Sequence, residues 1–449
     1  MTPLRCHGWI AALLLAGSAG LRADTALTWS RRVSGTQKDL RSVAYGQGRY
    51  LAVGHDWDGP VMLRSADGAA WSAAAAPVTA GDMVNLAFAQ GRFLLRTQSQ
   101  TWYSADGVVW TDCTPDRQPH WIRAAGGEFW GLNGNVISRS PDGLAWTVLL
   151  DPPDPRAVFR DIACGNGVTV AVGSDREGRI ALTRSADQGI HWAAVGPALE
   201  NTLQSVTYGN GLFVAVGGTG GQHGLIMTSP DGLAWTVRSD TYAYRLNHVR
   251  YAQGLFAIVG DAGTVLLSSD GIQWTRQWAD GGAPVTGQPL YAVCEAQGRF
   301  LAVGRKGAIV QSDPVPMLPE PLIVVNGARG ALTVGRSDPV TVAIALNAGS
   351  YAGVLPVDYI VLAVAEGGPW FYLDAARRWI PLGSRDPADC RPVHSGLLMD
   401  LPVPIVVLQA RSLAPGVYDC YFVLDYPMNG LFDGIPRQYR YDRVRVVVQ

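Results

Sequence analysis

The chain has 449 residues, of which 48% are hydrophobic and 16% charged, with 36 basic and 37 acidic side chains. A low charged fraction with ordinary apolar content excludes a disordered chain, and 53 glycines without a three-residue period exclude collagen. The near-zero net charge gives no electrostatic footprint for nucleic acid or an anionic membrane, so we expect no nucleic-acid partner. The length predicts two or three domains.

Residues 1–23 have the pattern of a signal peptide. Arg5 precedes an apolar run from Trp9 to Ala19, and Ala23 is the small residue that ends the pattern. The run is about half as long as a membrane-spanning helix, and no later apolar stretch is long enough to insert. We therefore expect a soluble, monomeric exported protein, secreted or periplasmic, with association to the cell surface left open.

One short string, Ser-x-Asp-Gly-x-x-Trp, recurs through the first two thirds of the chain. Five copies end in a tryptophan after an Asp-Gly pair, and a sixth, Ser185 to Trp192, carries one extra residue; the five end at Trp71, Trp110, Trp146, Trp235 and Trp274. Consecutive tryptophans of the six copies are 39, 36, 46, 43 and 39 residues apart, which is typical of β-propeller blades. Because Asp and Ser bond the backbone of tight turns and Gly allows a positive φ, we interpret the repeated aspartates as structural.

A Gly-rich hairpin string lies upstream of each copy, clearest in residues 43–54 and 206–217, and defines seven modules of four strands. The last module, Leu290 to Ser312, stops after three strands. Residues 25–31, which contain Trp29, have the pattern of the missing fourth strand. Pairing it with the last module would close a ring and cover an open sheet edge. We predict an all-β chain with a seven-bladed β-propeller over residues 24–313, closed by the N-terminal strand.

The repeated string resembles the Asp-box, or BNR repeat, of sialidase-like, sortilin-like and photosystem-assembly-factor-like propellers, and the module resembles repeats in bacterial exported proteins. The resemblance covers the predicted propeller, and only the copy at 185–192 has the full Asp-box spacing. In those families the box is a structural turn away from the active site. The resemblance therefore implies the fold and carries no activity with it.

Residues 314–321 are rich in proline and predict a stiff linker before a second domain, residues 322–449. Short β-rich runs with Gly and Pro breaks predict an antiparallel β-sandwich there. Its segments 347–353, 414–418 and 425–433 resemble a C-terminal module of proteobacterial exported proteins, which implies no activity.

Two features of this second domain have chemical alternatives. Cys390 and Cys420 are its two cysteines and are predicted to form a disulfide. Asp425, Asn429 and Asp433 are candidate calcium ligands, although Pro427 and the missing acidic residue at the twelfth position favour a plain turn. In the propeller, Cys164 and Cys294 belong to modules that are not neighbours, so we expect free thiols.

Propeller topology puts the variable loops between second and third strands on the same face as the linkers between blades. Because these loops differ in length and chemistry, we expect a glycan or protein to bind there. Aromatic and charged side chains suit sugar or peptide recognition. The predicted ligand-binding residues are His55, Trp57, Arg176, Tyr244 and Arg305. No cofactor, metal or catalytic residue is predicted.

Three function classes stay open. A non-enzymatic recognition or adhesion protein is favoured. A sialidase-like enzyme would require three arginines around a carboxylate, a tyrosine and a general acid, and no such set can be assigned; another glycan-cleaving enzyme would require two facing carboxylates, for which Asp56 or Asp58 with Glu177 are candidates. The third class is a periplasmic assembly factor that holds a partner protein.

Overall fold

The computed structural model describes residues 27–115, 119–149, 156–197, 199–219, 222–279, 283–315, 320–328, 330–347, 356–365, 370–373, 379–381, 394–397, 401–410, 414–425 and 439–449. Apart from two 3-10 turns, Asp261–Gly263 and Arg305–Gly307, the regular structure described is all β. The chain divides into two compact units, of which Ala26–Val315 is one and Pro316–Gln449 belongs to the other. Within the described residues, no helix has the length and apolar character that a membrane crossing requires.

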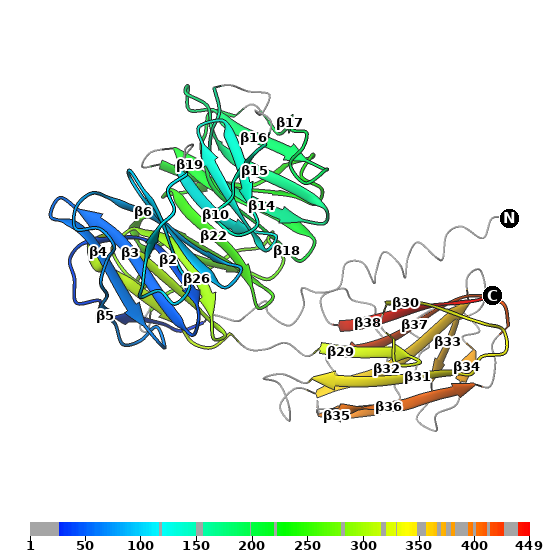
Figure 1. Ribbon diagram of the computed structural model, residues 1–449. Helices are drawn as coiled ribbons and strands as arrows, with labels where there is room; N and C mark the ends of the chain where they lie inside the picture. Colours follow the sequence, from blue (N-terminus) through cyan, green and yellow to red (C-terminus); the bar gives the residue numbers. More distant parts are fainter. Residues whose placement is uncertain are drawn as a thin grey trace. The chain divides into compact units, whose positions relative to one another are not determined.

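The first unit contains seven four-stranded antiparallel sheets in its described residues, which confirms the predicted propeller fold (Figure 1). Blades one to four consist of β2 (Asp39–Gly46), β3 (Arg49–Asp56), β4 (Gly59–Ser65) and β5 (Ser72–Ala73); β6 (Met83–Ala89), β7 (Arg92–Thr97), β8 (Thr101–Ser104) and β9 (Thr111–Asp112); β10 (Trp121–Ala125), β11 (Glu128–Asn133), β12 (Val136–Ser140) and β13 (Thr147–Val148); and β14 (Val158–Gly165), β15 (Val168–Ser174), β16 (Ile180–Ser185) and β17 (Ala193–Ala194). Blades five to seven consist of β18 (Leu203–Gly209), β19 (Leu212–Thr219), β20 (Gln222–Ser229) and β21 (Thr236–Tyr242); β22 (Leu246–Ala252), β23 (Leu255–Gly260), β24 (Val265–Ser268) and β25 (Thr275–Arg276); and β26 (Leu290–Ala296), β27 (Arg299–Gly304), β28 (Ile309–Ser312) and β1 (Trp29–Arg32).

The N-terminal strand closes the ring, as predicted. β1 pairs antiparallel with β28, with Trp29 opposite Ser312, and completes the sheet β1-β28-β27-β26. Trp29 is 3% exposed and packs in an apolar cluster that includes Phe300 of the same blade and Leu255 of blade six. The strand therefore supplies both the missing edge and part of the core between two blades.

In six of the seven blades described, a bulky side chain near the start of the second strand fills the core. These side chains are fully buried aromatics: Tyr50, Phe93, Phe129, Phe213, Phe256 and Phe300. In blade four, Thr169 takes the equivalent position and is 5% exposed. The repeated hydrophobic strings of the sequence therefore become the contacts between neighbouring sheets.

The Asp-Gly turns have the structural role expected of them. In the first turn the Ser65 hydroxyl accepts the backbone N–H of Gly68, and the Asp67 carboxylate accepts those of Ala69 and Ala70 at 2.8 and 3.0 Å. The indole N–H of Trp71 donates to the carbonyl of Gly68. In all six copies the serine donates to the aspartate and accepts the glycine N–H. The aspartate carboxylates are thus occupied by hydrogen bonds within the turns.

Replacing Asp142 by alanine is expected to lower the free energy of unfolding by about 1 kcal/mol, because two backbone N–H groups lose their acceptor much as at a helix N-cap. Chemical denaturation measures the change. The control is Leu144→Ala in the same turn, whose side chain is 40% exposed. If both variants unfold at the wild-type denaturant concentration, the structural role is refuted.

The second unit is a β-sandwich of two sheets. One contains β29 (Glu320–Val325), β31 (Val340–Asn347) and β36 (Leu401–Ala410). The other contains β30 (Gly330–Val334), β38 (Tyr439–Val448), β37 (Gly416–Asp425), β32 (Pro356–Ala365), β33 (Trp370–Leu373) and β34 (Trp379–Pro381), and β35 (His394–Leu397) pairs with β32. All pairs are antiparallel except β30 with β38. The predicted antiparallel β-sandwich is confirmed, and this one edge pair departs from it because the chain leaves β29 for the other sheet and runs beside the last strand in the same direction.

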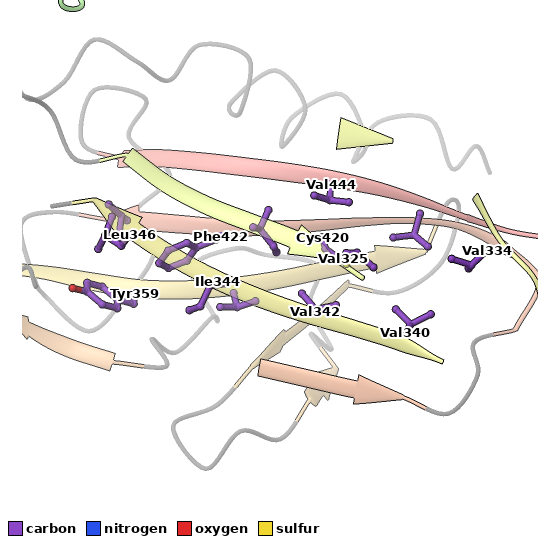
Figure 2. Close-up of a cluster of buried hydrophobic side chains, with 14 of the residues drawn as sticks. Val325, Val334, Val340, Val342, Ile344, Leu346, Tyr359, Cys420, Phe422 and Val444 are labelled. Carbon is purple, nitrogen blue, oxygen red and sulfur yellow. The ribbon is translucent and has the colours of Figure 1, made fainter. Parts of the chain in front are cut away.

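The sandwich core lies between the inner faces of the two sheets (Figure 2). Val342 and Ile344 of β31 face Phe422 of β37 and Val444 of β38 across it, and all four side chains are at most 4% exposed. Cys420 belongs to the same cluster, where burial raises the pKa of its thiol to about 12.

The sequence predictions for thiols and calcium have different outcomes. Cys164 and Cys294 are free, as expected. Cys420 is also a free thiol in the structure, but Cys390 lies outside the described residues, so the disulfide stays a prediction. Asp425 ends β37, whereas Asn429 and Asp433 also lie outside the described residues. The calcium candidates are therefore untested.

Candidate binding site at the centre of the propeller

The first strands of all seven blades surround a channel of about 430 Å³. Because the blades are antiparallel, one end of each first strand lies with the linkers between blades and with the loops joining second and third strands. We call this side of the propeller the linker face. The other side carries the Gly-rich hairpins and the Asp-Gly turns and is called the hairpin face. The channel residues nearest the linkers form its linker-face mouth.

A β-bulge recurs near the beginning of six first strands. In β2 it falls between Leu40 and Ser42, so that Arg41 has no partner residue on β3. The six bulged residues are Arg41, Val84, Arg160, Gln204, Asn247 and Tyr291. Arg41, Arg160, Gln204, Asn247 and Tyr291 line the channel. Because a bulge redirects a side chain out of the regular alternation, it presents these five residues at the mouth, each from a different blade.

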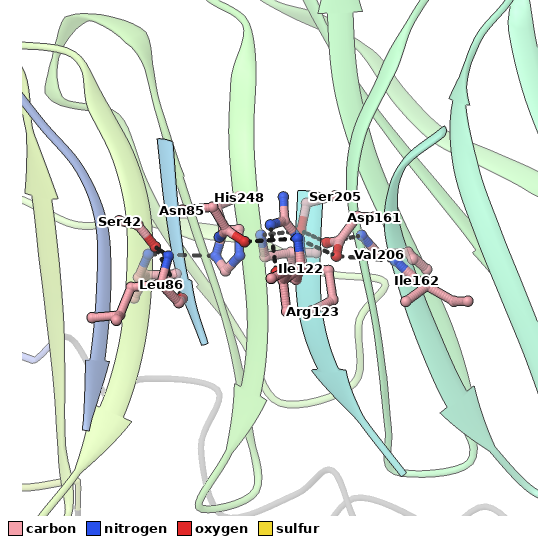
Figure 3. A network of polar contacts seen from close by, with 12 residues as sticks. Ser42, Asn85, Leu86, Ile122, Arg123, Asp161, Ile162, Ser205, Val206 and His248 are labelled. Carbon is pink, nitrogen blue, oxygen red and sulfur yellow. Dashed lines mark hydrogen bonds and ion pairs between the residues drawn. The ribbon is translucent and has the colours of Figure 1, made fainter. Parts of the chain in front are cut away.

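In five of the six bulged strands the residue after the bulge has a different task, which is to join neighbouring blades. Its side chain accepts a backbone N–H from the first strand of the next blade, and Figure 3 shows the resulting row of polar contacts. The acceptors and the residues that donate to them are Ser42 from Leu86 (3.1 Å), Asn85 from Ile122 (2.9 Å), Asp161 from Val206 (3.0 Å), Ser205 from Val249 (3.2 Å) and His248 from Val293 (3.4 Å). We call these five acceptors the polar belt.

Asp161 is the most connected member of the polar belt. Its carboxylate accepts the guanidinium Nε–H of Arg123 at 2.8 Å and the Ser205 hydroxyl at 2.5 Å, in addition to the backbone N–H groups of Val206 and Ile162. The carboxylate is 6% exposed. Its acceptor sites are occupied by protein groups, so it serves as a joint between three blades.

His248 holds its belt position as a neutral imidazole, since its Nδ1 accepts the Val293 N–H. Burial lowers its pKa from 6.5 to about 4, with further lowering by Arg123 and Arg250 and opposition from Asp161. A depressed histidine pKa stabilises the fold fully above the unfolded value of 6.5, and this contribution is lost as the pH falls through that value towards 4.

Lowering the pH from neutral to about 5 should therefore cost the wild type about 2 kcal/mol more than His248→Asn. Asparagine is the natural occupant of this position in blade two, where Asn85 accepts the equivalent N–H. Denaturation of both proteins at the two pH values measures the difference. Equal losses would show that His248 is not held neutral.

The lining of the channel as a whole is polar and positively charged. In the described lining, five arginines face two carboxylates, Asp161 and Glu295. Arg41 bonds Asp39 at 3.0 Å and lies over the Tyr291 ring at 4.5 Å. On the opposite side of blade seven, Asn247 accepts from Arg245 and donates to Asp261. The bulged residues are thus held by their neighbours at the mouth.

Of the five residues predicted to bind ligand, the structure places His55 at the channel. Its Nδ1 lies 3.3 Å from the Met83 carbonyl, and its Nε2 lies 3.5 Å from the carboxylate of Asp82. The other four are on the linker face but do not line the channel. Trp57 and Tyr244 are 91% and 42% exposed. Arg176 and Arg305 are also exposed, in the β15–β16 loop and the turn after β27.

The carboxylates considered for glycan cleavage are engaged elsewhere. Asp56 pairs with Lys38 at 3.4 Å and accepts the backbone N–H of Asp58. Glu177 pairs with Arg179 and with Arg156. None of these acids lines the channel. Within the described residues, no group of three or more His, Cys, Asp or Glu side chains could hold a metal ion.

Sequence reasoning missed the bulged residues because it searched the variable loops. A signal was present in the first strands. Regular alternation leaves one residue between two apolar positions on the same face, but in these strands two residues lie between them. The pattern occurs at Leu40-Arg-Ser-Val43, Phe159-Arg-Asp-Ile162, Leu203-Gln-Ser-Val206, Leu246-Asn-His-Val249 and Leu290-Tyr-Ala-Val293. Such a break in alternation indicates a bulge.

The seven blades and their central channel define the protein as a β-propeller, here joined to a β-sandwich. No family model and no curated protein matches the chain. Solved structures do, over about two thirds of the chain. A structure described as YCF48 bound to D1 peptide matches with a TM-score of 0.50 and 17% identity, covering 66% of this chain and 98% of that one.

Virginiamycin B lyase from Staphylococcus aureus is also similar, with a TM-score of 0.52 and 11% identity over 64% of this chain and 99% of that one. A catalytically inactive variant of that lyase with quinupristin gives a TM-score of 0.53 at 11% identity, over the same shares of the two chains. At these identities the matches establish the propeller fold alone. One neighbour is described with a bound peptide and another as a lyase, so the fold does not decide the function.

Proposed function

We propose that this chain is an exported, non-enzymatic recognition protein whose propeller binds a segment of a partner protein at the linker-face mouth of the channel. The observation that carries the proposal is that adjacent residues of the first strands have two different roles. The polar belt joins the blades, and the bulged residues beside it differ from blade to blade although the fold requires no such diversity. Varied polar and aromatic side chains around a concavity suit recognition of one particular ligand.

Exposed aromatic residues extend this surface around the mouth. Trp57, Tyr244 and Trp278 are 91%, 42% and 44% exposed, and each lies in a linker or a loop of the linker face. The guanidinium of Arg276 lies 4.6 Å from the ring centroid of Trp278. Aromatic and arginine side chains are the usual anchors of protein interfaces. The similar structure described as bound to a peptide supports a protein ligand over a glycan.

The test is selection of random linear 12-residue peptides displayed on phage against the exported chain, residues 24–449. We expect enriched peptides whose affinity falls at least tenfold in the double variant Trp57→Ala/Tyr244→Ala, since one interface aromatic anchor contributes about 2 kcal/mol. The matched control is Val109→Ala/Ile190→Ala, which removes side chains that are 69% and 55% exposed on Asp-Gly turns of the hairpin face.

Retention of full affinity in the Trp57→Ala/Tyr244→Ala variant would contradict the location of the site. Failure to enrich any peptide, together with binding on a glycan array, would contradict the class of ligand. Equal loss in the control variant would mean that the substitutions act on the whole propeller and not on the mouth.

A further inference from the structure

Arg160 is a partly buried arginine of the channel whose charge the described protein does not satisfy. It is the bulged residue of β14 and lines the channel. Its Nε–H is buried and has no hydrogen-bond partner among the described residues. No ion pair of Arg160 occurs in the described part of the chain either. A buried donor without an acceptor is costly, so its retention calls for a reason.

Two other arginines show how this propeller normally treats such a group. Arg96, which is 5% exposed, donates to the carbonyls of three residues, Pro119, Gln98 and Gln100. Arg123 donates to the Asp161 carboxylate at 2.8 Å. The fold can therefore provide acceptors for buried guanidinium groups. It does so for Arg96 in blade two and for Arg123 in blade three, whereas Arg160 belongs to blade four.

The surroundings of Arg160 increase its need for an anion. Burial lowers the pKa of its guanidinium, and the positive charge of Arg245 lowers it further. Of the two carboxylates in the described lining, Asp161 is engaged by Arg123, and Glu295 lies at the hairpin-face end of β26. Arg41 and Arg245 have carboxylates beside them, Asp39 at 3.0 Å and Asp261 at 4.0 Å. Arg160 is thus the arginine of the mouth for which the described residues provide no counter-charge.

We propose that Arg160, supported by Arg245, binds a carboxylate of the ligand that enters the linker-face mouth. This inference rests on the proposed function and adds the chemistry of the ligand. A carboxylate matches the planar guanidinium and would accept charge-assisted hydrogen bonds from its N–H groups. The carboxylate could be the C-terminus of a peptide or an acidic side chain, and both present the same two oxygens.

The first experiment measures the unfolding midpoint of residues 24–449 with three small probes at constant ionic strength. These are N-acetylglycine, which carries a terminal carboxylate, the α-amide of N-acetylglutamate, which carries a side-chain carboxylate, and uncharged N-acetylglycine amide. We expect a saturable rise of the midpoint with at least one of the carboxylates and none with the amide. The probe with the larger rise identifies the source of the carboxylate.

The rise should disappear in Arg160→Gln, be reduced in Arg160→Lys, and persist in Arg250→Gln, which removes an arginine of the hairpin-face end of the same channel. Without any probe, Arg160→Gln should unfold at or above the wild-type midpoint, because the substitution removes a partly buried charge that has no described partner. A rise that survives in Arg160→Gln, an equal rise with the amide, or no rise with either carboxylate would overturn the inference.

Selected peptides separate this inference from the proposed function. Peptides that require Trp57 and Tyr244 but bind Arg160→Gln at full affinity would overturn the inference and leave the proposed function in place. If the protein enriches no peptide but binds a carboxylate probe only when Arg160 is present, the proposed function is contradicted and the inference about Arg160 stands.

Discussion

Replacing Trp29 by alanine is expected to lower the free energy of unfolding of the propeller by about 3–5 kcal/mol, because a large side chain leaves a cavity in a core that cannot fully collapse. Trp29 is 3% exposed and packs between blades six and seven. Its strand is also held by backbone contacts, since the Thr28 carbonyl accepts the N–H of Asp313 at 2.8 Å. Denaturant unfolding followed by tryptophan fluorescence measures the change.

The matched control is Val33→Ala, immediately after β1, whose side chain is 85% exposed and which should leave stability within about 0.5 kcal/mol of wild type. Deleting residues 27–32 should have a larger effect than Trp29→Ala, because it also leaves β28 as an open edge. A deleted protein that unfolds at the wild-type denaturant concentration would show that the ring does not depend on this strand.

Replacing Asp161 by alanine is expected to cost about 3–5 kcal/mol, because it leaves the Arg123 guanidinium partly buried and unpaired. It also removes the acceptor of the Ser205 hydroxyl and of two backbone N–H groups. The loss should act on the joints between blades three, four and five. Unfolding in denaturant, with near-ultraviolet circular dichroism to confirm the native fold, measures it.

Ser42→Ala provides the graded comparison, because Ser42 accepts a single backbone N–H in the same polar belt and should cost about 1–2 kcal/mol. Blade seven has alanine at the equivalent position, Ala292, so the fold tolerates the residue there. Equal costs for Asp161→Ala and Ser42→Ala would show that the Arg123 pair contributes nothing beyond the shared belt contact.

The sequence by itself determined the propeller, its N-terminal closure and the role of the Asp-Gly turns. These features are local or repeated. Ser65, Asp67 and Trp71 lie within seven residues of one another, and each hairpin joins neighbours along the chain. Trp29 could be assigned to the last blade because the repeat left one strand missing and one strand unused. Local hydrogen bonding and alternating burial require no knowledge of distant contacts.

Only the tertiary structure decided the site. Arg41 and Tyr291 are far apart in the sequence, yet they touch because closing the ring makes blades one and seven neighbours. Val206 donates to Asp161 from 45 residues away. Among the described residues the Nε–H of Arg160 has no partner, whereas Arg96 and Arg123 have theirs, and this depends on which groups reach each guanidinium after the blades have packed. The sequence shows that these residues are present. Long-range packing decides which of the charged side chains have partners and which side chains face the channel.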